Sequence, residues 1–268
     1  MYDNRPVGIF DSGVGGLTIF SEITKLLPRE SIIYLADQNN IPYSGKSKKE
    51  LEKITSNVVR FLLENDAKIV VVACNTATVY TLDYLRSEFD IPIIGIVPII
   101  KTAAEKTKIG RIGILSTVAT AESDYQKELI KKFTNGLKVF NVGTDKIVPF
   151  IEGGEVYSSK LTATLKDVLK YFASIDVLAL GCSHYPFARR KIQKILGQKV
   201  LVLDSGPAVA RQVKRVLENN KILSNKKGKT KFFTTENPWN FRWVAEKLIN
   251  AKLDPDIIGV ATVEKAIL

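Results

Sequence analysis

Two cysteines and one histidine are the most reactive side chains of this sequence, and their spacing is regular. Cys74 follows the hydrophobic run 69–73, and Cys182 follows the hydrophobic run 176–181. His184, the only histidine, comes two residues after the second cysteine. Small polar residues that follow a buried parallel strand lie where open α/β sheets bind ligands. Two thiols in such positions, one in each half of the chain, predict paired acid/base chemistry on one small substrate.

Each thiol also has a simpler interpretation, because a free cysteine is most often a small buried hydrophobic residue. The matching positions and the polar residues after each cysteine favour a functional pair. A thiol of ordinary pKa is only a few per cent thiolate at neutral pH, so it needs activation. A helix start after Cys74 and the imidazole of His184 near Cys182 would provide it. Close Cys-x-x-Cys spacing is absent, which disfavours a metal site, whereas a reversible disulfide stays open.

A glycine-rich turn, residues 13–16, lies between the first predicted strand and a predicted helix. The backbone N–H groups of such a turn bind anions. Neither a Walker lysine nor Gly-x-Gly-x-x-Gly is present, so no nucleotide is expected and the anion should be small, such as a carboxylate. Asp11 precedes this turn at the mouth of the strand, where a carboxylate has no obvious packing role.

The elements that must position these residues alternate between strands and helices, which predicts an α/β fold with parallel sheets. In the first half of the chain the predicted strands are 7–10, 31–35, 69–73 and 91–96. Between them we expect helices 18–27 and 76–89, one that begins after Ser47 with Glu50 in a capping box, and one that begins at Pro98.

The pattern repeats in the second half of the chain at a nearly constant offset. The offsets are 105, 108 and 107 residues for the pairs Gly8 and Gly113, Cys74 and Cys182, and Ile93 and Val200. We therefore expect an internal duplication that gives two similar parallel-sheet domains related by pseudo-twofold symmetry, with the active site in the cleft between them.

The predicted domains are 1–97 together with 214–268, and 98–213. The strand expected at 231–234 and the helix at 239–249 lie outside the repeat and should pack back onto the first domain.

The formal net charge of +11 raises the possibility of nucleic-acid binding, but no binding motif accompanies it. A positive field would equally favour an acidic substrate. No apolar stretch of about 18 residues predicts a membrane span. The first strand begins too early to leave room for a signal peptide, so we expect reduced thiols and a cytoplasmic protein without nucleic-acid or membrane partners.

Several motifs resemble those of the cofactor-independent glutamate racemases, within the aspartate/glutamate racemase superfamily. They are residues 11–13, 42–43, 73–77 and 181–186, together with Thr117, Thr120, Ser123, Tyr125 and Glu152. The resemblance implies two α/β domains that enclose glutamate and invert it with two cysteines, without pyridoxal phosphate, metal or other cofactor. It also implies a role in supplying D-glutamate for peptidoglycan, and a homodimer.

The resemblance further implies the role of each site residue. Cys74 would be the base for one enantiomer and Cys182 for the other, with Asp11 assisting Cys74, and His184 with Glu152 assisting Cys182. The residues expected to bind substrate are Asp11, Ser12, Tyr43, Ser44, Asn75, Thr76, Thr117, Thr120, Ser183 and His184.

The chain departs from the common family pattern at Ser44, Ala119 and Ser183, none of which removes a catalytic group. Aspartate racemases usually carry a glutamate where His184 stands, so the histidine favours glutamate as substrate. The alternatives are an aspartate racemase or another amino-acid racemase, a thiol redox protein, and a basic nucleic-acid-binding protein.

Overall fold

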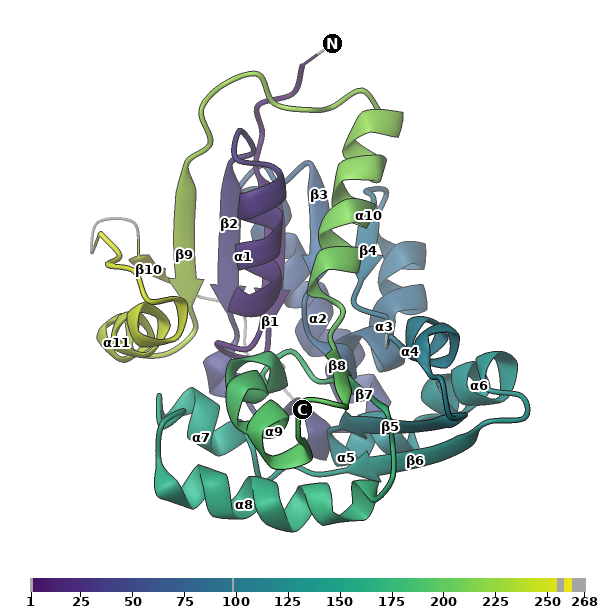
Figure 1. Ribbon diagram of the computed structural model, residues 1–268. Helices are drawn as coiled ribbons and strands as arrows, with labels where there is room; N and C mark the ends of the chain where they lie inside the picture. The colour runs from purple at the N-terminus through teal and green to yellow at the C-terminus, as the bar shows by residue number, and fades with distance from the viewer. Residues whose placement is uncertain (1, 98, 255–257, 262–268) are drawn as a thin grey trace.

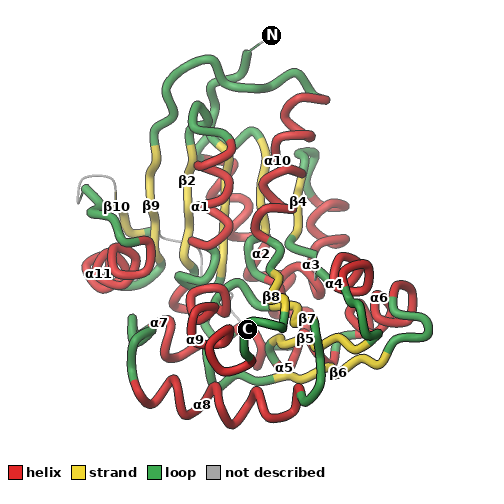
Figure 2. The backbone as a smooth tube through the Cα atoms, in the orientation of Figure 1, coloured by secondary structure: helices red, strands yellow, loops and turns green. Residues whose placement is uncertain are grey.

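The computed structural model describes residues 2–97, 99–254 and 258–261, and within these ranges the strands form two parallel sheets (Figures 1 and 2). The first sheet has the order β10-β9-β2-β1-β3-β4, and the second has the order β6-β5-β7-β8. The first sheet consists of β1 Val7–Asp11, β2 Ile32–Ala36, β3 Ile69–Val72, β4 Ile93–Gly95, β9 Thr230–Thr234 and β10 Ile258–Val260. The second consists of β5 Arg111–Ser116, β6 Lys138–Gly143, β7 Val177–Gly181 and β8 Leu201–Leu203.

Helices cover both faces of the first sheet, with α1 and α10 on one face and α2 and α3 on the other (Figure 1). The α-helices are α1 Leu17–Leu26, α2 Lys48–Glu64, α3 Asn75–Glu88, α4 Ile100–Lys106, α5 Val118–Glu122, α6 Asp124–Phe133, α7 Val148–Glu152, α8 Ser159–Leu169, α9 Arg189–Leu196, α10 Gly206–Asn219 and α11 Pro238–Ile249. Short 3-10 turns are η1 Gln38–Asn40, η2 Tyr43–Gly45, η3 Lys170–Phe172 and η4 Tyr185–Ala188. None of the helices in the described ranges is long and apolar enough to cross a bilayer.

The hydrophobic runs of the sequence become strands that are buried on both faces, as parallel strands between two helix layers must be. Along β1, Val7 and Ile9 face the cluster that contains α1 and α10, whereas Phe10 faces the cluster under α2 and α3. The predicted capping box is also present at the start of α2. The Glu50 N–H donates to the Ser47 hydroxyl, and the Glu50 carboxylate accepts the Ser47 N–H at 2.8 Å.

The two sheets share one core topology, which supports the internal duplication and confirms the predicted fold class. The order β2-β1-β3-β4 matches the order β6-β5-β7-β8 strand for strand. The register agrees as well, since Gly8 pairs with Ile33 and Val70 while Gly113 pairs with Phe140 and Leu178.

The C-terminal segment returns to the first sheet, as predicted. Strand β9 pairs with β2, and α11 packs against α1 and β9. The expected helix start at Pro98 lies outside the described residues, and α4 begins at Ile100. The predicted limits of the two domains stay a prediction. The expected boundary at residue 214 falls inside α10, and this helix packs against α1.

Candidate active site

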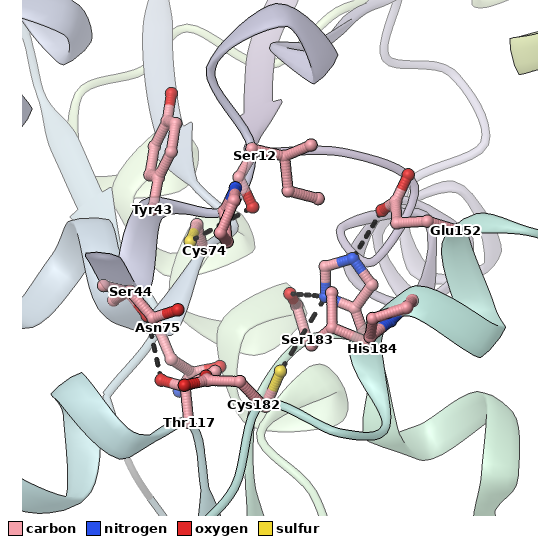
Figure 3. Close-up of a pocket in the computed structure, with 16 residues that line it drawn as sticks. Ser12, Tyr43, Ser44, Cys74, Asn75, Thr117, Glu152, Cys182, Ser183 and His184 are labelled. Carbon is pink, nitrogen blue, oxygen red and sulfur yellow. Dashed lines mark hydrogen bonds and ion pairs between the residues drawn. The ribbon is translucent and has the colours of Figure 1, made fainter. Parts of the chain in front are cut away.

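A cavity of about 360 Å³ lies where the carboxyl ends of the strands from both sheets meet (Figure 3). Equivalent strands supply its walls, because the segments that follow β1, β2 and β3 face those that follow β5, β6 and β7. The lining residues predicted from the sequence are Ser12, Tyr43, Ser44, Cys74, Asn75, Thr76, Thr117, Glu152, Cys182, Ser183 and His184. Two other predicted residues, Asp11 and Thr120, lie behind this wall and reach the cavity through hydrogen-bonded neighbours.

Cys74 enters the cavity from the first sheet and is the N-cap residue of α3. Its thiol is buried and free, and its Sγ lies 3.8 Å from the Ser12 hydroxyl oxygen. Burial, reinforced by the negative charge of Asp11, raises the pKa of the Cys74 thiol to about 12. The start of α3 therefore does not by itself make the thiolate that the sequence pattern suggested, because burial disfavours the charged form more strongly.

Cys182 enters from the second sheet and faces an imidazole instead of a hydroxyl. Its Sγ lies 3.7 Å from His184 Nδ1, and His184 Nε2 lies 2.6 Å from Glu152 Oε1. Burial favours a neutral His184, but its hydrogen bonds to Cys182 and Glu152 and their charges outweigh this and hold its pKa well above the usual value. Burial also acts to raise the pKa of Glu152, yet the bonds and charge of His184 lower it. The Cys182 sulfur therefore lies beside a histidine of raised pKa, which is itself held by a carboxylate.

The glycine-rich turn binds a carboxylate, but that carboxylate is the side chain of Glu152 in place of a small-molecule anion. The Val14 N–H donates to Glu152 Oε1 at 2.8 Å. A Cβ on Gly13 would lie 2.1 Å from Glu152 Oε1, and one on Gly15 would lie 2.3 Å from His184 Nδ1. The glycines are therefore required because the two side chains press against the turn.

Asp11 bridges the two halves of the site. Its carboxylate accepts the Gly13 N–H at 2.8 Å and the hydroxyl of Ser183, from the opposite sheet, at 2.9 Å. Burial raises the pKa of Asp11 to about 6, although the positive charge of His184 opposes this effect. The hydrogen bond from Ser183 connects Asp11 to the Cys182 side of the site, and the expected assistance of Asp11 to Cys74 stays a prediction.

Three threonine hydroxyls form a second bridge across the cavity. Thr76 Oγ1 lies 3.0 Å from Thr117 Oγ1 and 3.2 Å from Thr120 Oγ1. The Thr117 hydroxyl donates to Thr120 at 2.9 Å and also caps the start of α5. These residues present neutral donors between the two sheets.

Tyr43 contributes its ring to the cavity wall, and its hydroxyl is directed away from the centre of the cavity (Figure 3). That hydroxyl donates to Asp37 at 2.6 Å. The structure therefore places a protein partner where the sequence suggested contact with a polar group of the substrate. The neighbouring Ser44 does line the cavity.

Comparison of the sequence with known protein families shows which family contains this chain. The family described as Asp/Glu/Hydantoin racemase matches residues 15–213. This chain is a member of that racemase family. The resemblance inferred from the cysteine motifs is thereby confirmed.

Individual racemases match over nearly the whole chain. A protein named glutamate racemase from Deinococcus radiodurans is 37% identical over 88% of this chain and 84% of its own length. The glutamate racemase of Escherichia coli, solved with L-glutamate and the activator UDP-MurNAc-Ala, has a TM-score of 0.86 and 30% identity, covering 97% of this chain and 99% of its own. The Francisella tularensis glutamate racemase, solved with D-glutamate, has a TM-score of 0.84 and 31% identity, covering 98% and 99%.

Sequence reasoning missed some residues of this racemase site. Asp145 lines the cavity after β6, and its Oδ1 has no hydrogen-bond partner among the described residues. Gln38 donates to Glu152 Oε2 at 3.0 Å from the first turn after β2. The signal that could have found both is the one that found the cysteines, namely polar residues directly after a strand. Among the described residues no group of three or more His, Cys, Asp or Glu side chains is arranged to hold a metal ion.

Proposed function

We propose that this protein is a glutamate racemase that interconverts L- and D-glutamate and so supplies D-glutamate for peptidoglycan. The observation that carries the proposal is the pair of free thiols, Cys74 and Cys182, which enter one cavity from two equivalent sheets (Figure 3). Relatives with the same fold are named glutamate racemase, and two of them hold L- and D-glutamate. A substrate carbon between the thiols would have one on each face.

In the proposed reaction the thiolate of one cysteine removes the α-proton from one face, and the thiol of the other gives a proton to the opposite face. The α-hydrogen of an amino acid is a very weak acid, so the carboxylate needs donors as negative charge develops on it. Removing one such preorganised donor typically costs about 3–4 kcal/mol. Asn75 is well suited to this role, because it lines the cavity and its buried Nδ2 has no hydrogen-bond partner among the described residues. Thr76 would add a hydroxyl donor, and the hydroxyls of Thr117 and Ser183 would have to turn from Thr120 and Asp11 to donate as well.

The two halves would manage their protons differently. On the Cys182 side, His184 can donate from both ring nitrogens when protonated, to Glu152 and toward the sulfur. On the Cys74 side no imidazole is present, so we propose that Asp11 and the substrate ammonium act there. A cation near a buried thiol favours its charged form, and glutamate brings that cation with it.

The wider setting is proposed on the family resemblance. We propose that residues 1–97 with 214–268 and residues 98–213 act as two domains around the substrate, and that the enzyme is a cytoplasmic homodimer. Sedimentation of the purified protein tests the dimer, and a single monomer mass at micromolar concentration would contradict it.

The test of the proposed function is incubation with L-glutamate in D₂O without added cofactor. We expect loss of optical rotation together with one α-deuterium in each D-glutamate formed, because the proton is delivered from a thiol that exchanges with solvent. L-Aspartate is the matched control substrate. Rapid inversion of aspartate with none of glutamate would contradict the proposal in favour of an aspartate racemase. If neither substrate is inverted and both thiols are lost reversibly under air, the result would favour a redox protein. Salt-dependent binding to DNA would instead favour a nucleic-acid-binding protein.

A further inference from the structure

Gln38 connects the C-terminal strand β9 to the catalytic centre. It is buried in η1, with only 6% of its surface exposed. Its Nε2 donates to Glu152 Oε2 at 3.0 Å, and its Oε1 accepts the Thr234 hydroxyl at 2.9 Å. Thr234 is the last residue of β9 and is fully buried. A chain of contacts therefore runs from β9 through Gln38 to a carboxylate of the opposite half of the molecule.

The Glu152 carboxylate and the Thr234 hydroxyl together fix which way the amide of Gln38 faces. A hydroxyl that donates to the amide oxygen leaves the amide NH₂ group for Glu152, which as a carboxylate can only accept. Glu152 then has a donor on each oxygen, with Val14 N–H and His184 on Oε1 and Gln38 on Oε2. Both oxygens are fixed, so the plane of the carboxylate is fixed as well.

We propose that Gln38, oriented by Thr234, is a positioning residue that holds Glu152 ionised and aligned with His184. This inference rests on the proposed racemase function. Gln38 does not line the cavity, so it acts on the reaction through Glu152 and His184. Thr234 lies outside residues 15–213, the part of the chain that the family model matches. The orientation of Gln38 therefore depends on the C-terminal segment.

The charges around Glu152 explain why an extra donor is useful there. His184 is the favourable neighbour, whereas Asp11 is a second buried carboxylate whose charge acts against that of Glu152, and Tyr34 also lies close enough to respond to it. A hydrogen bond to an ionised group is stronger than one between neutral groups. Gln38 thus stabilises the ionised carboxylate of Glu152 in the presence of the nearby carboxylate of Asp11.

The single histidine of the chain makes the inference directly measurable, since ¹⁵N-histidine labelling gives the signal of His184 alone. The test variants are Gln38→Met, which keeps the length of the side chain without its amide, and Gln38→Glu, which places a like charge beside Glu152. Thr235→Val is the matched control, because the Thr235 hydroxyl donates to Asp37 and makes no hydrogen bond to Glu152 within the described residues. The measurements are the His184 titration and the separate values of kcat and KM for glutamate.

In the wild type, uptake of a proton by Glu152 should appear as an acid-side step in the His184 signal. We expect this step to move up by about one pH unit in Gln38→Met, further in Gln38→Glu, and not at all in Thr235→Val. We also expect kcat to fall about tenfold in Gln38→Met while KM stays within about twofold, since misplacement of a catalytic group affects the chemical step. If Gln38→Met does not fold, Thr234→Val should give a smaller shift in the same direction.

An unmoved acid-side step in both folded Gln38 variants would overturn the inference, and so would a rise in KM with kcat unchanged. Failure of the proposed function is a different result, because wild-type protein would then not invert glutamate at all. The titration of His184 needs no substrate and tests the positioning role in either case.

Discussion

At the scale of single residues, the two thiols occupy equivalent positions but have unlike neighbours. Cys74 has the Ser12 hydroxyl nearby, whereas Cys182 has the imidazole of His184, which is in turn held by Glu152. The two sheets have matching strands, whereas the residues that follow those strands differ between the two thiols. An enzyme of this kind needs a base on each face of the carbon, but the two bases do not need the same support.

Replacing either thiol should abolish inversion, because each is needed in one direction as the base and in the other as the acid. For Cys74→Ser and Cys182→Ser we expect kcat for racemisation to fall by about 10²–10⁴-fold, the usual contribution of a positioned acid or base. Circular dichroism of glutamate measures the rate. Near wild-type activity in either variant would rule out the two-thiol scheme.

Asp11 should make the protein less stable at neutral pH than a neutral residue would. Its pKa in the folded state is about 6, against 3.8 as the ordinary value, so the folded protein holds this proton more tightly than the unfolded chain does. The cost of ionisation is absent below about pH 4, grows between pH 4 and 6, and is complete above pH 6. We expect Asp11→Asn to raise the free energy of unfolding by about 1–3 kcal/mol at pH 7.5 and by little at pH 4. Urea denaturation at the two pH values checks this, and an equal change at both would contradict it.

At the scale of elements, the turn between β1 and α1 shows how a strand end and a helix start build a catalytic site. The turn receives Glu152 from α7 and lies against His184, which follows β7. Two elements of the second sheet are thereby fixed by one turn of the first. The requirement for glycine in the turn is steric, since any side chain on Gly13 or Gly15 would occupy the space of the Glu152–His184 pair.

Gly15→Ala should therefore displace His184 without unfolding the protein. We expect kcat/KM to fall about 10²-fold, the effect of a misplacement of about 1 Å. Gly45→Ala is the control, because a Cβ there has nothing within 4 Å and Gly45 does not line the cavity. Comparison of the steady-state kinetics of the two variants is the measurement. Similar activity in both would show that His184 can move without consequence.

At the scale of the whole molecule, the cavity lies between two sheets of matching topology, and the C-terminal segment extends the first of them with β9 and β10. A buried ion pair connects distant parts of that first half. Lys68 Nζ lies 2.6 Å from Glu30 Oε2 and donates to the carbonyl oxygens of Asp3, at 2.6 Å, and Ile222, at 2.7 Å. The beginning of the chain, the segment before β3 and the segment after α10 meet at this one ammonium group.

Lys68→Met should destabilise the protein by about 3–5 kcal/mol, because it leaves the Glu30 carboxylate buried without its partner. The matched control is Lys101→Met, which removes the exposed pair of Lys101 and Glu105 and should cost less than about 1 kcal/mol. Chemical denaturation measures both. A small effect of Lys68→Met would contradict this expectation and would mean that Glu30 is solvated or takes up a proton in the variant.

Much of the fold could be predicted from the sequence, because its signals are local. Continuous hydrophobic runs predict buried parallel strands, and Ser47 with Glu50 predicts the start of α2, which the structure confirms. The duplication was visible because equivalent strands kept equivalent spacing. The positions of Cys74 and Cys182 followed directly, since a residue after a parallel strand lies at the carboxyl edge of its sheet.

Contacts between the two sheets could not be predicted in this way. The sequence identified an anion-binding turn, but only tertiary structure shows that Glu152, far along the chain, supplies the anion. It identified Cys74 at a helix start, but only the tertiary structure shows the burial beneath α2 and α3 that, with the charge of Asp11, raises the pKa of the thiol to about 12. Local pattern determines strands, helices and the edge at which polar residues gather, whereas the hydrogen-bond partners and charge states of those residues depend on the side chains that the tertiary structure places beside them. The sequence by itself therefore determined the two thiols and their placement, and the tertiary structure decided how differently each of them is supported.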